Sequence, residues 1–195
     1  KVADLHKRAN LLMTDSVHGH YKGNVVVDVE RNALICNGNT VHLIYADGPD
    51  KVDYTAYGIN NAVVVDNTGI WRTEKDLGLH LVSKGASQVV LTAPGKGDLP
   101  NIVMGVNSEQ YLGKDADFDG NIVSAASCST NAVVPVIKLI DDKFGIENGH
   151  IETIHSFTND QNLIDNFHVK HRRGRSAVLN MVLTETGAGA ATAKA

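Results

Sequence analysis

The chain has 195 residues, of which 43% are apolar and 21% are charged, and its formal net charge is −4 at pH 7. This composition is typical of a soluble globular protein with one domain or parts of two. The negative charge argues against a nucleic-acid-binding module, and no apolar stretch is long enough to cross a membrane. No signal peptide opens the chain and it has only two cysteines, so we expect a cytoplasmic protein without a disulfide framework or a zinc site.

The first predicted elements are short antiparallel strands. Residues 24–46, with the sequence NVVVDVERNALICNGNTVHLIYA, alternate apolar runs with Asn and Gly. Asn37-Gly38-Asn39 has the composition of a hairpin turn. Cys36 lies in one of these strands, where an inert, small apolar side chain is the ordinary interpretation of a cysteine.

From residue 61 the pattern changes to buried strands joined by a helix. NAVVVDNTG (61–69) is an apolar strand that ends in a polar loop, and EKDLGLHLVSKGA (74–86) has the spacing of a helix. SQVVLTAPGKGD (87–98) and NIVSAAS (121–127) predict two further strands. A strand, a helix and a strand in this order indicate parallel pairing with right-handed crossovers.

Polar residues follow each of these three strands. Ligands bind beyond the carboxyl ends of the strands in such sheets. Those ends carry Asn67-Thr68-Gly69, Thr92-Ala93-Pro94-Gly95 and Ser127-Cys128-Ser129. Three short polar loops at one sheet edge predict a binding site there.

A second helix is predicted after Cys128, because apolar residues recur at helical spacing as far as Phe144 and Gly145 can stop the helix. Pro135 suits only a first helical turn, so the helix either begins just before Pro135 or kinks there. HIETIHSFT (150–158) alternates as a strand would. Residues 159–180 are polar and weakly periodic, which is typical of a functional loop. The Ala and Gly residues at 187–195 are compatible with the start of a helix.

Cys128 is placed where a nucleophile would be useful. At a junction of strand and helix, backbone N–H groups and the helix dipole favour the reactive thiolate. A nucleophilic cysteine also needs a base, and His155 is the best-placed of nine histidines. The residues alone leave open a buried inert thiol and a core histidine. They also leave open whether nearby hydroxyls bind an anion or only cap helices and turns.

Many segments resemble the phosphorylating glyceraldehyde-3-phosphate dehydrogenases, in that family's order and over nearly the whole chain. The most specific are SAASCSTNAVVPVIKLIDDKFGI and TIHSFTNDQNLID, and TDSVHGHYKGNV, TAPGKGD, GVNSEQY and RRGRSAVLNMVLTETGA also match. NTGIWR and NDQNLIDNFH are most similar to a longer bacterial branch. The chain resembles the middle portion of such a protein, without its opening strand and Gly-rich turn.

The resemblance implies roles for individual residues. Cys128 would be the nucleophile and His155 the general base. Substrate and phosphate groups would be bound by Ser127, Ser129, Thr158, Arg173, Thr186 and Gly187. Arg173 belongs to a loop that in the family borders a neighbouring subunit's cofactor. Thr68, Gly69 and Thr92 would face the cofactor, and no metal is implied. Ser129 stands where the family has threonine and keeps the hydroxyl.

The resemblance also implies the fold and the reaction. The fold would be α/β, with the remainder of a Rossmann-type NAD(P)-binding domain over residues 1–126. The start of an α+β catalytic domain would follow over residues 127–195. The enzyme would be a homotetramer that oxidises glyceraldehyde 3-phosphate with NAD or NADP and inorganic phosphate, giving an acyl phosphate in glycolysis or gluconeogenesis.

Three other functions are compatible with the same residues. Erythrose-4-phosphate dehydrogenase has the same cysteine chemistry. A non-catalytic fragment of the fold would explain why no Gly-x-Gly-x-x-Gly occurs here, and for the same reason we expect this chain by itself to bind NAD weakly and to be inactive. A thiol redox sensor would need an exposed Cys128 but would not need His155.

Overall fold

The computed structural model of the chain describes residues 2–116 and 118–193. They form two compact units, Lys1–Asp53 and Tyr54–Ala195. Each unit has a hydrophobic core of its own. None of the described helices is long and apolar enough to cross a membrane.

The first unit is a helix packed on small antiparallel strands. Helix α1 (Val2–Met13) buries Leu5 and Ala9, which lie one turn apart, against Leu34. This helix was not predicted from the sequence. The strands of the unit are β1 (Thr14–Asp15), β2 (Gly19–His20), β3 (Val25–Asp28), β4 (Ala33–Cys36) and β5 (Asn39–His42).

The antiparallel strands predicted over residues 24–46 are confirmed. β4 pairs with β3 on one side and with β5 on the other. Between β4 and β5, Asn37 and Gly38 both have positive φ angles, of 49° and 84°. Two consecutive left-handed residues make the turn that matches the twist of a hairpin, and Asn-Gly is the pair that adopts it most readily.

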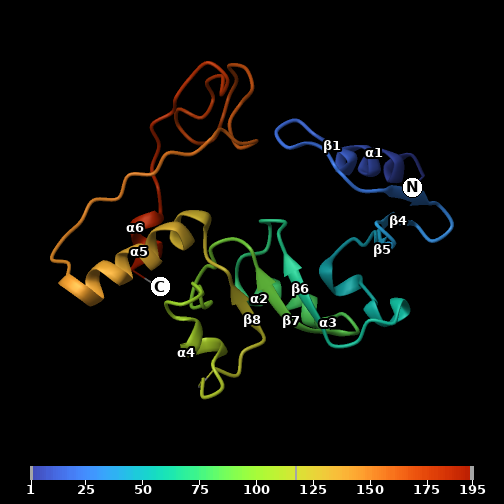
Figure 1. Ribbon diagram of the computed structural model, residues 1–195, viewed down its shortest axis with the longest axis horizontal. Coiled ribbons are helices and arrows are strands. Elements are labelled where there is room, and N and C mark those ends of the chain that lie inside the picture. The colour runs from blue at the N-terminus through green and yellow to red at the C-terminus, as the bar shows by residue number, and fades with distance from the viewer. Residues whose placement is uncertain (1, 117, 194–195) are drawn as a thin grey trace. The chain divides into compact units, whose positions relative to one another are not determined.

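The second unit is built on a three-stranded parallel sheet (Figure 1). β7 lies between β6 and β8 and is parallel to both. The predicted parallel pairing is confirmed and gives an α/β architecture of the Rossmann type. Its C-terminal residue Leu91 is paired with Asp66 on β6 and with Ser124 on β8. The polar loops after the three strands therefore begin at the same sheet edge. The strands are β6 (Ala62–Asp66), β7 (Ala86–Leu91) and β8 (Ile122–Ser124).

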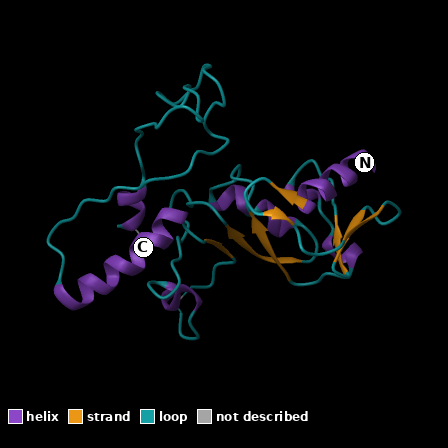
Figure 2. Ribbon diagram, turned by 45° about the horizontal axis from the view of Figure 1, so that its top comes forward, coloured by secondary structure: helices purple, strands orange, loops and turns teal. Residues whose placement is uncertain are grey.

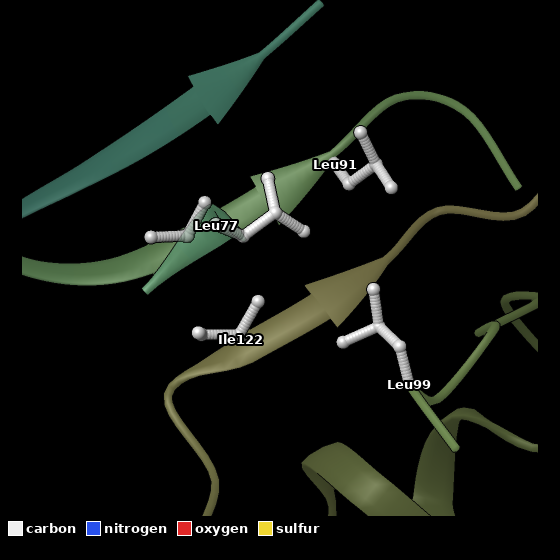
Figure 3. Close-up of a cluster of buried hydrophobic side chains, with 5 residues drawn as sticks. Leu77, Leu91, Leu99 and Ile122 are labelled. Carbon is white, nitrogen blue, oxygen red and sulfur yellow. The ribbon is translucent and has the colours of Figure 1, made fainter. Parts of the chain in front are cut away.

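The core of this sheet is made of aliphatic side chains from strands, helix and loop (Figure 3). Leu77, Val89 and Leu91 are completely buried, and Leu99 and Ile122 pack with them. Burying a leucine side chain stabilises a fold by about 1.5–3 kcal/mol relative to leaving it exposed. This core fixes the strand ends from which the polar loops leave.

The helix predicted over residues 74–86 is two shorter helices, α2 (Glu74–Leu77) and α3 (Leu79–Val82). Gly78 lies between them, and its N–H donates to the carbonyl groups of Glu74 and Asp76. Glycine is a poor helix former because it loses more backbone freedom than other residues, so the helix is interrupted there. The other short elements are η1 (Pro49–Lys51), η2 (Tyr54–Tyr57), α4 (Ser108–Leu112) and α6 (Ala188–Thr192).

Helix α5 (Cys128–Phe144) follows β8 and is the longest helix of the second unit. It begins at Cys128 and runs through Pro135, so the expectation of a start just before Pro135 is wrong. It ends where predicted, because Gly145 has a φ of 73° and its N–H donates to the carbonyl of Asp141. Val134 is the apolar residue that α5 buries.

Residues 146–187 contain no helix and no strand, and Figure 2 draws this stretch as loop. The strand predicted over 150–158 is therefore wrong. The side chains there alternate as in a strand, but a strand also needs a neighbour to complete its ladder, and none of the described strands pairs with it. The prediction of an irregular segment over 159–180 is confirmed.

Candidate functional site

A sharp turn between β8 and α5 presents Cys128. Ala126 has a left-handed backbone, with a φ of 59°, and its side chain is buried. Ser127 is extended again and is the N-cap of α5. Cys128 is then the first helical residue, and its thiol is exposed. The structure thus places this cysteine at the positive end of a helix, in reach of solvent.

Local hydrogen bonds hold this turn. Ser127 Oγ accepts from the backbone N–H of Thr130 at 3.0 Å and lies 2.7 Å from Thr130 Oγ1. Asn131 Nδ2 donates to the carbonyl oxygens of Ala125 and Ser127, at 2.8 and 2.9 Å. The sequence analysis assigned no role to Asn131, although an amide four residues after a cap is placed to bond back to the turn. Ser127, predicted to bind phosphate, uses its hydroxyl in capping here.

His155 reaches the same helix end as Cys128 without the predicted strand. Its Nε2 atom lies 3.3 Å from Ser129 Oγ, which is 4.0 Å from Cys128 Sγ. The Ser129 hydroxyl therefore lies between the thiol and the imidazole. None of the hydrogen bonds among the described residues joins Cys128 directly to His155. Both residues are exposed, so a substrate can reach them.

The three residues predicted to face the cofactor lie after β6 and β7, and Asp66 binds the two threonines among them. The backbone N–H and the hydroxyl of Thr68 donate to Asp66 Oδ1 at 2.9 and 2.7 Å. The Thr92 hydroxyl donates to the Asp66 carbonyl at 3.2 Å. Gly69 is left-handed, with a φ of 71°, and the space that a side chain would occupy there is open. An open polar loop at the carboxyl edge of a parallel sheet fits one side of a dinucleotide.

Asp66 is itself held by a buried histidine that the sequence analysis did not identify. His80 Nε2 donates to Asp66 Oδ2 at 2.9 Å, and the Trp71 ring packs against the imidazole in a T-shaped arrangement. His80 Nδ1 is buried without a partner. Burial raises the pKa of the Asp66 carboxyl, but hydrogen bonds from His80 and Thr68 outweigh it and hold that pKa below its ordinary value. The ionised carboxylate is thus the stable form.

The other predicted phosphate-binding residues lie in two separate places. Thr158 and Arg173 both contact Asp160: the Thr158 hydroxyl accepts from the Asp160 N–H, and Arg173 Nη1 donates to the Asp160 carboxylate. The Arg173 charge is thus paired inside the loop, and none of the contacts among the described residues joins it to Cys128. Thr186 Oγ1 accepts from the N–H of Ala188, and Gly187 precedes α6, which packs on α5.

Comparison with known protein families decides what these elements belong to. Residues 1–74 match the model described as glyceraldehyde 3-phosphate dehydrogenase, NAD binding domain. Residues 127–195 match the model described as glyceraldehyde 3-phosphate dehydrogenase, C-terminal domain. The two models together match most of the chain. The chain belongs to the glyceraldehyde-3-phosphate dehydrogenase family. The match of residues 1–74 to an NAD binding domain supports NAD or NADP as the cofactor.

Curated relatives are similar over almost all of the chain. It is 58% identical over 192 residues to a glyceraldehyde-3-phosphate dehydrogenase-like protein of Pseudomonas aeruginosa, which covers 98% of this chain and 41% of that relative. It is 38% identical to glyceraldehyde-3-phosphate dehydrogenase 1 of Bacillus subtilis, over 97% of this chain and 54% of the relative. The corresponding enzyme of Thermotoga maritima is 36% identical, over 98% of this chain and 55% of the relative.

The share of each relative that the chain covers shows how the lengths of these proteins compare. The chain spans about half the length of the curated relatives that it matches. The match of nearly equal length covers a smaller share of the Pseudomonas relative than of the Bacillus one, so the Pseudomonas relative is the longer protein. The predicted resemblance to a longer bacterial glyceraldehyde-3-phosphate dehydrogenase agrees with this. The predicted domain boundary at 126/127 remains a prediction.

Proposed function

We propose that Cys128 and His155 are the nucleophile and general base of a phosphorylating glyceraldehyde-3-phosphate dehydrogenase. The observation that carries the proposal is the arrangement at the start of α5. There a left-handed turn presents an exposed thiol, and His155 Nε2 contacts the hydroxyl that lies next to it. A nucleophile and a base that share one hydroxyl can act on one carbonyl group.

In the proposed reaction, the Cys128 thiolate attacks the aldehyde carbon, and a C–S bond forms as the carbonyl oxygen takes up a proton. His155 then accepts this hydroxyl proton as the C–H bond breaks and leaves a thioester. Bound NAD or NADP supplies the hydride acceptor for this oxidation. Inorganic phosphate attacks the thioester, the C–S bond breaks, and an acyl phosphate and the Cys128 thiolate are released.

Other residues have supporting roles in this proposal. Thr92 would line the nicotinamide side of the cofactor, and Thr68 and Gly69 would lie in a loop that faces the cofactor. The substrate and attacking phosphate groups would contact the hydroxyl or N–H groups of Ser127, Ser129, Thr158, Thr186 and Gly187. Arg173 would face a neighbouring subunit's cofactor in a cytoplasmic homotetramer. The 195 residues contain no Gly-x-Gly-x-x-Gly for the pyrophosphate, so we propose that this chain by itself is inactive.

Chemical labelling tests the central residue. With limiting iodoacetamide, we expect the label on Cys128 before Cys36, because Cys128 is exposed at a helix start and Cys36 is half-buried in β4. Peptide mass spectrometry of the intact protein gives both rates in one sample, so Cys36 is the internal control. Preferential labelling of Cys36 would contradict the assignment. Comparing the turnover of glyceraldehyde 3-phosphate with that of erythrose 4-phosphate tests the substrate.

A further inference from the structure

Ser124, the last residue of β8, is buried completely, yet it carries a hydroxyl. A buried hydroxyl is costly unless its hydrogen-bonding capacity is used. Ser124 Oγ donates to the carbonyl of Ala93 at 2.7 Å. It accepts from the backbone N–H groups of Gly95 and Ala126, at 3.2 and 3.0 Å. One donor and two acceptor positions are all that a hydroxyl offers, so each of them is in use.

These three partners belong to two different functional loops. Ala93 and Gly95 are in the cofactor-side loop, residues 92–95, which starts at Thr92. Ala126 is the left-handed residue of the nucleophile turn, residues 125–128. The hydroxyl of Ser124 therefore joins the two loops through three backbone groups. Asn101 shares two of these bonds, because its Oδ1 atom, 3.0 Å from Ser124 Oγ, is a second acceptor for the hydroxyl proton and also accepts from the Gly95 N–H at 2.9 Å.

The sheet itself does not make this connection. The N–H of Ala125 donates to the carbonyl of Leu91 at 2.8 Å, which continues the ladder between β8 and β7 by one step. Beyond that bond, the backbone hydrogen bonds of the described residues include none between residues 92–95 and residues 126–128. Past the ends of the strands, the distance between the two loops is thus set by side-chain contacts, with Ser124 at their centre.

We propose that Ser124 is a positioning residue that holds the nucleophile turn against the cofactor-side loop. This proposal rests on the proposed function, in which hydride passes between a carbon bound to Cys128 and a cofactor beside Thr92. Such a transfer depends steeply on distance, and a misplacement of about 1 Å can cost roughly 100-fold in rate. Ser124 touches neither substrate nor cofactor, and acts by fixing the backbone on both sides of the reaction.

Hydrogen exchange in the intact protein tests the junction without requiring activity. We expect Ser124→Ala to accelerate exchange of the Ala126 amide proton by roughly twofold to tenfold, the usual worth of one hydrogen bond, and that of the Gly95 amide proton by less, because the Gly95 N–H also donates to Asn101 Oδ1. Ser108→Ala is the matched control, because Ser108 is also a buried serine that accepts a backbone N–H, from Gly105 at 3.0 Å. It should leave both amides unchanged. Acceleration at Ala126 alone would overturn the proposal.

A second pair of variants separates the hydroxyl from the packing. Ser124→Thr and Ser124→Val add similar volume at this closed site, but only threonine keeps the hydroxyl. We expect Ser124→Val to lower kcat by roughly 10- to 100-fold relative to Ser124→Thr, with KM for aldehyde and cofactor within about twofold. Equal kcat values would overturn the proposal. Wild-type protein that labels Cys36 before Cys128 would instead contradict the proposed function, whatever the exchange result.

Discussion

The two halves of the candidate site are held in contrasting ways. On the nucleophile side, Ser124, Ala126 and Thr130 are almost fully buried, and side-chain hydrogen bonds fix the turn from both ends. On the base side, His155 lies on an exposed segment without secondary structure, and one 3.3 Å contact to Ser129 holds its imidazole. Ile154, next to it, is 92% exposed.

The contrast shows how far the local sequence determines the conformation of each half. The nucleophile turn is specified by residues that cap a helix, end a strand and fill a core within a few positions of Cys128. The position of His155 depends on contacts made over a longer range. Variants near His155 should therefore alter the chemistry and leave stability almost unchanged, whereas variants in the core that supports the nucleophile side should lower stability.

The largest expected effect is on the chemistry. In the intact protein, His155→Asn should slow hydride transfer by roughly two to four orders of magnitude, the usual range for a lost general base. It should also slow the alkylation of Cys128 at neutral pH, since asparagine cannot accept a proton from the thiol. Stopped-flow absorbance of the reduced cofactor and mass spectrometry measure the two rates. His150→Asn, on the same exposed segment, is the control. Unchanged rates in His155→Asn would contradict the assignment of His155 as the general base.

The next effect concerns stability and compares one buried with one exposed aliphatic residue. Leu91→Ala should lower the free energy of unfolding by about 2–5 kcal/mol, because it leaves a cavity in the core beneath the sheet. Ile154→Ala should change it by no more than about 0.5 kcal/mol, as for most surface positions. Urea titrations followed by circular dichroism measure both values. An equal loss at the two positions would show that the segment around His155 is as tightly packed as the sheet.

The smallest effect is expected from the Asp66–His80 pair. Because hydrogen bonds hold the folded-state pKa of Asp66 below its unfolded value, its stabilisation is present above that value and is lost as the pH falls below about 4. At neutral pH we expect Asp66→Asn to cost about 1.5–3 kcal/mol, typical of hydrogen bonds to a charged group. Thermal unfolding between pH 3 and 7 should show a shallower acid dependence for Asp66→Asn. Parallel curves for both proteins would contradict this role of Asp66.

The sequence predicted those elements whose signals are local. Continuous apolar runs marked β6 and β7, as is typical of strands in a parallel sheet, although β6 exposes Val63 and Val65. Asn37-Gly38 marked the hairpin because its backbone requirement is specific. Gly145 marked the end of α5 for a similar reason. The alternation around His155 predicted a strand wrongly, since alternation says which side chains share a face but not whether a neighbouring strand exists.

The sequence predicted the reacting residues of the candidate site but not the residues that hold them in place. Cys128 and His155 followed from residue type, from placement and from the resemblance to a family. The partnership of His80 with Asp66, and that of Ser124 with Ala93 and Gly95, join residues 14 or more positions apart. No periodicity encodes such pairs, because they depend on how strands and loops come together in three dimensions.

The backbone at Ala126 restricts which amino acids can precede the cysteine. Its left-handed φ angle favours glycine, asparagine and aspartate, and excludes β-branched side chains. Its burial at 3% exposure leaves no water to solvate an amide or a carboxylate. Alanine and glycine, the two smallest residues, satisfy both conditions. A library of all twenty residues at this position should therefore favour these two, selected by space and geometry and not by contact with a substrate.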